Sequence, residues 1–88
     1  TKALLNKAKD FIDCLYITAQ ETDTYFELNN PELAKDQVNL TDKEYEIFMK
    51  RLMSITYDRQ PLIYEFEGRW RSSLSKNKIK DYISEQIQ

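Results

Sequence analysis

Apolar residues recur at intervals of three or four along the first third of the chain, which is the spacing of one face of a helix. No Gly or Pro interrupts this segment, so the pattern predicts one long helix from about Lys2 to Leu28. Cys14, Tyr16 and Tyr25 widen the apolar arc to about half of the helix circumference, more than one packing partner covers. The stripe itself consists of Leu4, Leu5, Ala8, Phe11, Ile12, Leu15, Ala19, Thr22 and Phe26.

Two interpretations of this wide apolar face stay open. The helix can lie under the rest of its own domain, or it can pair with a second copy of itself about a two-fold axis. We expect the second arrangement, because the other predicted helices offer only narrow apolar stripes to cover a helix of roughly 40 Å. The expected homodimer interface consists of Leu4, Ala8, Phe11, Ile12, Leu15 and Ala19.

The clearest helix start in the sequence is Leu40-Thr41-Asp42-Lys43-Glu44-Tyr45. The Thr41 hydroxyl can accept a hydrogen bond from a first-turn N–H, and the Glu44 carboxylate can accept one from the Thr41 N–H. This reciprocal arrangement is a capping box. We expect the helix to run from about Asp42 to Asp58, because Pro61 prevents its continuation.

Residues 62–71 change to a period of two, which indicates a half-buried strand. The apolar face of this strand would hold Leu62, Tyr64, Phe66 and Trp70, with Gly68 marking a bulge or a close backbone approach. A helix with apolar residues at every fourth position stays open as an alternative. A strand also needs a paired neighbour. The candidates are residues 38–40, the same strand of a second chain, or a missing domain.

The other two segments are helical. Asn30-Pro31-Glu32 predicts a short helical turn after Asn29 or Asn30 ends the first helix, and residues 76–88 predict a last helix. Together the patterns predict a mainly helical α+β fold with a long N-terminal helix, a capped second helix, one extended strand and a C-terminal helix. We expect residues 1–88 to form a single domain. We also expect a fragment of a longer chain, because the helical pattern already begins at Thr1.

Charge and composition exclude several classes of site. The net charge is −2, so no basic field points to nucleic acid. With no His and one Cys, the chain lacks the usual zinc ligands and any Ser–His or Cys–His nucleophile. No apolar run approaches the roughly 20 residues of a membrane span, and no signal peptide is visible. We therefore expect no catalytic residue, metal or cofactor, and a cytoplasmic protein that is not an enzyme.

Aromatic residues give the main hint of a binding site. The six Tyr side chains each combine an apolar body with a polar tip. Such residues suit either a ligand pocket or an ordinary core whose hydroxyls reach the surface. The expected pocket, for a small apolar or aromatic ligand, is lined by Tyr45, Phe48, Tyr64, Phe66 and Trp70.

Arg69-Trp70-Arg71 places an aromatic residue between two cations, a pattern that also occurs in contacts with single-stranded nucleic acid. We favour a strand with Trp70 inward and both arginines in solvent, paired with carboxylates across the sheet. Glu65 and Glu67 are expected on the face of the arginines, where they cancel the positive field.

Leu40-Thr41-Asp42-Lys43-Glu44, opening a helix that ends in Tyr57-Asp58-Arg59, resembles the segment after the DNA-binding part of ArsR-like winged-helix transcription regulators. The resemblance covers about residues 3–59, and the residues after Pro61 match no part of it. It implies a dimerisation and ligand-sensing domain of a bacterial regulator, which contacts DNA only through an absent upstream domain. The alternative is a stand-alone protein–protein interaction module, such as a small phage or plasmid protein whose aromatic face docks a partner.

Overall fold

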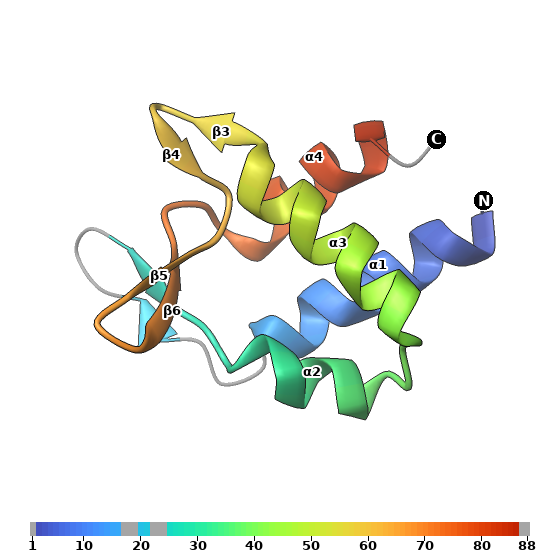
Figure 1. The fold of residues 1–88 in the computed structure, drawn as a ribbon. Helices are drawn as coiled ribbons and strands as arrows, with labels where there is room; N and C mark the ends of the chain where they lie inside the picture. Colours follow the sequence, from blue (N-terminus) through green and yellow to red (C-terminus); the bar gives the residue numbers. More distant parts are fainter. Residues whose placement is uncertain (1, 17–19, 22–24, 87–88) are drawn as a thin grey trace.

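The structure is a computed structural model that describes residues 2–16, 20–21 and 25–86. Figure 1 shows the helices gathered into one body, with a small antiparallel sheet at the end opposite the start of the first helix. The mainly helical α+β fold is therefore confirmed, although the described residues contain more strands than the expected one. The elements are α1 (Lys2–Leu15), β1 (Gln20–Glu21), β2 (Phe26–Glu27), α2 (Pro31–Gln37), α3 (Asp42–Ser54), β3 (Thr56–Tyr57), β4 (Gln60–Pro61), β5 (Tyr64–Phe66), β6 (Arg69–Ser72) and α4 (Lys76–Gln86).

The core lies between the helices. Helix α1 packs against α2 and α4, and α3 also packs against α4. The ring centroid of Phe11 in α1 lies 5.9 Å from that of Tyr45 and 6.1 Å from that of Phe48, both in α3. The fully buried apolar side chains are Ala8, Phe11, Ile12, Leu15, Ala34, Phe48, Leu52, Leu62, Ile63, Ile79 and Ile83.

The first helix is much shorter than the sequence pattern suggested. It ends at Leu15, and the part of the predicted helix around Phe26 is strand β2 instead. The reason is a distant cap: the Asn29 backbone N–H donates to the Leu15 carbonyl, and its side-chain amide donates to the Cys14 carbonyl. These bonds satisfy carbonyls that a continuing helix would have used. Asn29 thus does end the first helix, but from a separate segment.

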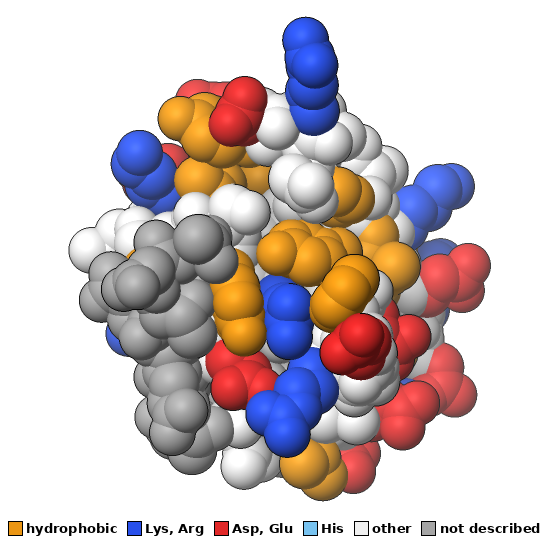
Figure 2. All heavy atoms as spheres, turned by 90° about the vertical axis from the view of Figure 1, so that its left-hand side faces the viewer, with side chains coloured by type: hydrophobic (Ala, Val, Ile, Leu, Met, Phe, Trp, Pro, Cys, Tyr) orange, Lys and Arg blue, Asp and Glu red, His pale blue; other side chains and the backbone are white. Residues whose placement is uncertain are grey.

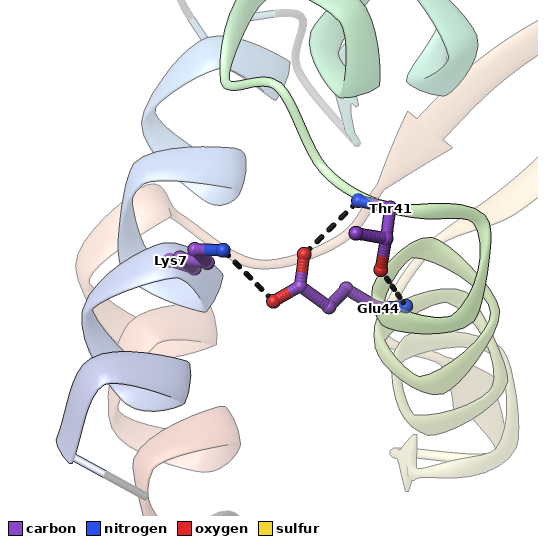
Figure 3. Close-up of polar contacts among 3 residues, drawn as sticks. All are labelled: Lys7, Thr41 and Glu44. Atoms are coloured by element: carbon purple, nitrogen blue, oxygen red, sulfur yellow. Dashed lines mark hydrogen bonds and ion pairs between the residues drawn. The ribbon is translucent and has the colours of Figure 1, made fainter.

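The capping box at the start of α3 is present as predicted (Figure 3). The Glu44 N–H donates to the Thr41 hydroxyl at 3.1 Å, and the Thr41 N–H donates to the Glu44 carboxylate at 3.0 Å. Lys7 of α1 donates to the other Glu44 oxygen at 2.9 Å. The cap therefore also ties α3 to α1. The shorter α2 is likewise capped as expected, with the Asn30 side chain accepting from an N–H of its first turn.

The end of α3 differs from the prediction. The helix ends at Ser54 rather than near Asp58, and the chain then forms the β3–β4 hairpin. Asp58 and Arg59 both have positive φ, at 52° and 69°. Positive φ at both turn residues matches the twist of a two-residue hairpin, which competes with the helix in this segment. Tyr57-Asp58-Arg59 therefore belongs to a hairpin and not to a helix end.

We predict that Thr41→Ala lowers the free energy of unfolding by about 1 kcal/mol, because the Glu44 N–H loses its acceptor. Thr41→Ser keeps the hydroxyl and serves as the control. Denaturant midpoints of the three proteins test this. A midpoint for the alanine variant equal to that of wild type would show that the cap contributes nothing to stability.

The same cap predicts a pH dependence. The Thr41 N–H, and then the Lys7 ammonium, hold the pKa of the Glu44 carboxyl below its ordinary value of 4.5. Stability from this group is therefore complete above that value and is lost as the pH falls through the lower pKa of the folded state. Glu44→Gln should flatten the fall in stability between about pH 5 and pH 3. The exposed Glu46→Gln is the matched control, and equal flattening in both variants would refute the assignment.

The predicted single strand is two strands joined by a tight turn. Strands β5 and β6 pair with Tyr64 opposite Arg71 and Phe66 opposite Arg69, and the sheet order is β1-β2-β6-β5. Gly68 (φ 80°) and the residue before it both have positive φ, as a two-residue hairpin turn requires. Gly68 therefore forms a turn rather than a bulge. The strand's neighbours come from the chain itself, and residues 38–40 form no strand.

Candidate functional site

Two faces of the sheet differ sharply in chemistry. Residues paired directly across an antiparallel sheet point to the same side. Trp70 and Phe26 pack partly buried against the core, and Ser72 is fully buried. The opposite side, which we call the outer sheet face, carries aromatic and charged side chains. Its members are Tyr25, Glu27, Tyr64, Phe66, Arg69 and Arg71.

Arg71 lies at the centre of the outer sheet face. Its guanidinium carbon is 4.1 Å from the ring centroid of Tyr25 and 4.9 Å from that of Phe66. A guanidinium attracts the electron-rich face of an aromatic ring, and each such contact is worth about 0.5–1 kcal/mol at exposed sites. Residues far apart in the sequence thus hold the Arg71 side chain in place.

The two arginines of β6 have different partners. Arg69 Nη1 donates to Glu27 Oε1 at 2.6 Å, and the two opposite charges cancel. Pairing with a carboxylate across the sheet was predicted for both arginines. Glu27 also lies opposite Arg71 in the sheet register. Nevertheless, within the described residues Arg71 forms no ion pair, and its buried Nε has no hydrogen-bond acceptor. The prediction of a paired arginine is therefore confirmed for Arg69 and wrong for Arg71.

A shallow hollow of about 450 Å³ opens beside the Arg71 side chain. Figure 2 looks onto this end of the molecule and shows hydrophobic side chains gathered around basic ones. Phe66 keeps 50% of its surface exposed, which is unusual for so large an apolar side chain. The hollow is lined by Tyr25, Gln60, Tyr64, Phe66, Arg71 and Ser73.

The structure divides the five residues of the expected pocket among three places. Tyr64 and Phe66 line the hollow, whereas Phe48 is fully buried in the core. Tyr45 packs on the ring of Phe11, and Trp70 lies on the inner face of the sheet. These five side chains therefore do not form one pocket. The period of two placed Trp70 on the same side as Tyr64, but it does not continue through the two-residue turn. Beyond the turn, Arg69 and Arg71 share the side of Tyr64 and Phe66, and Trp70 points to the other side.

The expected dimer interface is also placed differently. Ala8, Phe11, Ile12 and Leu15 are 0–1% exposed within a single chain, because α2, α3 and α4 cover them. Leu4 is partly buried against the same core. Ala19 lies outside the described residues. The apolar face of α1 thus packs into the domain core, which is the first of the two interpretations above, and Ala8, Phe11, Ile12 and Leu15 offer no surface to a second copy.

Other candidate sites are weaker. A second hollow of about 340 Å³ lies along α3, but it is lined by just Ile47, Lys50, Arg51 and Ser54, and Arg51 donates to Gln86. Burial raises the pKa of the Cys14 thiol, and the thiol form is a poor nucleophile. Within the described residues no group of His, Cys, Asp and Glu could hold a metal ion.

One signal for this site was present in the sequence, namely the Arg69-Trp70-Arg71 run next to Phe66. The hairpin turn at Glu67-Gly68 was the missing step, since it places Phe66 and Arg71 on the same side. The contribution of Tyr25 carries no local signal, because β2 reaches β6 only through tertiary pairing.

No helix among the described residues is long and apolar enough to cross a membrane.

Comparison with known proteins adds no assignment to this geometry. No family model, curated protein or solved structure matches the chain. The resemblance to ArsR-like regulators therefore remains a prediction that rests on residues 40–44 and 57–59.

Proposed function

We propose that this chain is a non-catalytic interaction module that docks a partner protein on its outer sheet face. The observation that carries the proposal is Phe66, half exposed at the rim of a hollow that also holds Tyr64 and Arg71, an arginine without an ion pair in the described part of the chain. Exposed aromatic residues and Arg are enriched where proteins bind one another. Three other large apolar side chains, Leu33, Met53 and Tyr57, are also exposed, but none of them lines the hollow.

This proposal corresponds to the alternative drawn from the sequence, the stand-alone interaction module. A role in a transcription regulator stays a prediction from the resemblance, with DNA contacted only by residues outside this chain. Dimerisation is not part of this proposal, because four of the six expected interface residues, Ala8, Phe11, Ile12 and Leu15, are buried within one chain. A location in the cytoplasm is part of this proposal.

Selection of binders from a random peptide library displayed on phage tests the proposal. Peptides enriched on the wild-type protein should lose most of their affinity for Phe66→Ser, which removes the exposed ring without opening the core. Leu33→Ser is the matched control, because Leu33 is 60% exposed on α2 and lies outside the hollow. Selected peptides should bind this control as tightly as wild type.

The contradicting results are equally clear. Peptides that bind Phe66→Ser and wild type equally, but fail on Leu33→Ser, would move the interaction surface to α2. Failure to enrich any peptide dependent on Phe66 or Tyr64 would remove the outer sheet face as a docking surface.

A further inference from the structure

The Arg71 guanidinium is the polar group whose bonding the described residues leave most incomplete. Its Nε is buried without an acceptor, and no side-chain hydrogen bond or ion pair of Arg71 exists within the described residues. Burial of an unsatisfied donor is unfavourable, most of all when the donor belongs to a charged group. The two Nη atoms of Arg71 are not among the buried ones and have no hydrogen-bond acceptor within the described residues either. They are the N–H donors that a ligand in the hollow can reach.

We infer that the outer sheet face binds an extended acidic segment of a partner protein, with one carboxylate received by Arg71. This inference rests on the proposed function and names the chemistry of its partner. A guanidinium stacked on aromatic rings presents its N–H groups in the plane between them. That planar fork matches the two oxygens of a carboxylate, and charge-assisted pairs of this kind are the stronger hydrogen bonds in proteins.

The occupant is a peptide segment because a strand edge lies beside the hollow. Strand β5 is the last strand in the sheet order, and β6 is its one partner within the described residues. Tyr64 and Phe66 belong to this strand and also line the hollow. An extended segment can pair its backbone with such an edge while alternate side chains enter the neighbouring pocket. A Glu or Asp side chain on the side of the pocket would reach Arg71 in this way, while its two sequence neighbours point to the other side.

Charge favours a carboxylate over nucleic acid. The chain carries a net charge of −2, and the other arginine of the outer sheet face is already neutralised by Glu27. Nucleic-acid binding depends on several cations that displace counterions along the backbone. A doubly charged phosphate also recruits more than one cation in typical sites. One unpaired Arg71 therefore fits a single carboxylate better than either of these groups.

The test uses the blocked tripeptide acetyl-Val-Glu-Val-amide and its Val-Gln-Val twin, titrated into the isotope-labelled chain and followed by NMR. Wild type should bind the Glu peptide at least about tenfold more tightly than the Gln peptide, as expected when one partner of a charge-assisted bond is removed. Arg71→Gln removes the positive charge from the hollow and should lose this discrimination. Lys50→Gln, which removes one positive charge at the other hollow, should retain it.

Four outcomes decide the inference. Equal affinity for the two peptides, with both lost in Phe66→Ser, would overturn the carboxylate and leave the proposed docking surface intact. Absence of binding at about 10 mM would overturn the inference, whereas the proposed function would be judged by the phage selection. Stronger binding of a phosphoserine peptide or of a ten-residue oligouridine would also overturn it. Retained discrimination in a folded Arg71→Gln protein would show that another residue binds the carboxylate.

Discussion

Phe11→Ala is expected to lower the free energy of unfolding by about 3–5 kcal/mol, the usual cost of removing a buried Phe. The ring is fully buried and contacts Tyr45 and Phe48, so its loss leaves a cavity between α1 and α3. A domain of this size is stable by only about 5–10 kcal/mol, so the variant should be largely destabilised at room temperature. Urea unfolding followed by Trp70 fluorescence measures the effect.

The Phe11→Ala variant also tests whether the Phe11 ring lies in the core of one chain or in an interface between two chains. Sedimentation of wild type should show a monomer, because the α1 side chains are already buried within one chain. Leu33→Ala, at an exposed apolar position, is the control and should change stability by less than about 0.5 kcal/mol. A wild-type dimer that Phe11→Ala converts to a folded monomer would return this ring to an interface and contradict its place in the core.

Ser72→Ala is expected to cost about 2 kcal/mol, although it removes a single oxygen. The Ser72 hydroxyl is fully buried, donates to the Leu62 carbonyl at 2.7 Å and accepts from the Leu74 N–H at 3.1 Å. Alanine would leave both backbone groups buried without a partner, and each such group carries a desolvation penalty of about 1–3 kcal/mol. These bonds fix the end of β6, so Ser72 also supports the outer sheet face.

The neighbouring Ser73→Ala provides the control, because Ser73 is exposed. Urea midpoints of the two variants and wild type, with unchanged slopes, give the two stability changes. Equal midpoints for Ser72→Ala and Ser73→Ala would mean that water replaces the hydroxyl and that the buried bonds do not hold the strand.

Local signals in the sequence were sufficient for the helix starts. Thr41 and Glu44 are three residues apart, and Asn30 precedes Pro31, so each cap can be recognised without knowing the rest of the chain. The amphipathic patterns of α3 and α4 likewise depend on neighbours within one turn. These parts of the fold were predicted with the correct type and start.

Features set by distant partners were not predictable in the same way. Helix α1 ends because Asn29 bonds to the carbonyls of Cys14 and Leu15 from another segment. Strand β2 lies between β1 and β6, and Phe26 pairs with Ser72, so the place of this strand in the sheet depends on a distant partner. In the sequence, the helical spacing of apolar residues continues through this region, and no Gly or Pro marks the end of a helix. The resulting overlong helix then produced the expectation of a dimer.

The candidate site combines features that have local signals in the sequence with features that depend on distant partners. The sequence pointed to Phe66 and to Arg69-Trp70-Arg71, but it assigned Trp70 to the wrong face because the turn at Gly68 was interpreted as a bulge. Pairing of Arg69 with Glu27 and stacking of Arg71 on Tyr25 require β2, β5 and β6 to be assembled. The distinction between the neutralised and the unpaired arginine is therefore visible only in three dimensions.

The NMR signal of the Arg71 Nε–H group tests the account most directly, because it reports on the guanidinium for which the described residues provide no acceptor. During titration with acetyl-Val-Glu-Val-amide the signal should shift progressively and saturate, together with the backbone amides of Tyr64 and Phe66. The Gln peptide should leave it nearly unchanged. An Arg71 Nε–H signal that does not move while amides of Ile47 and Lys50 on α3 shift would contradict the account and place binding on the other hollow.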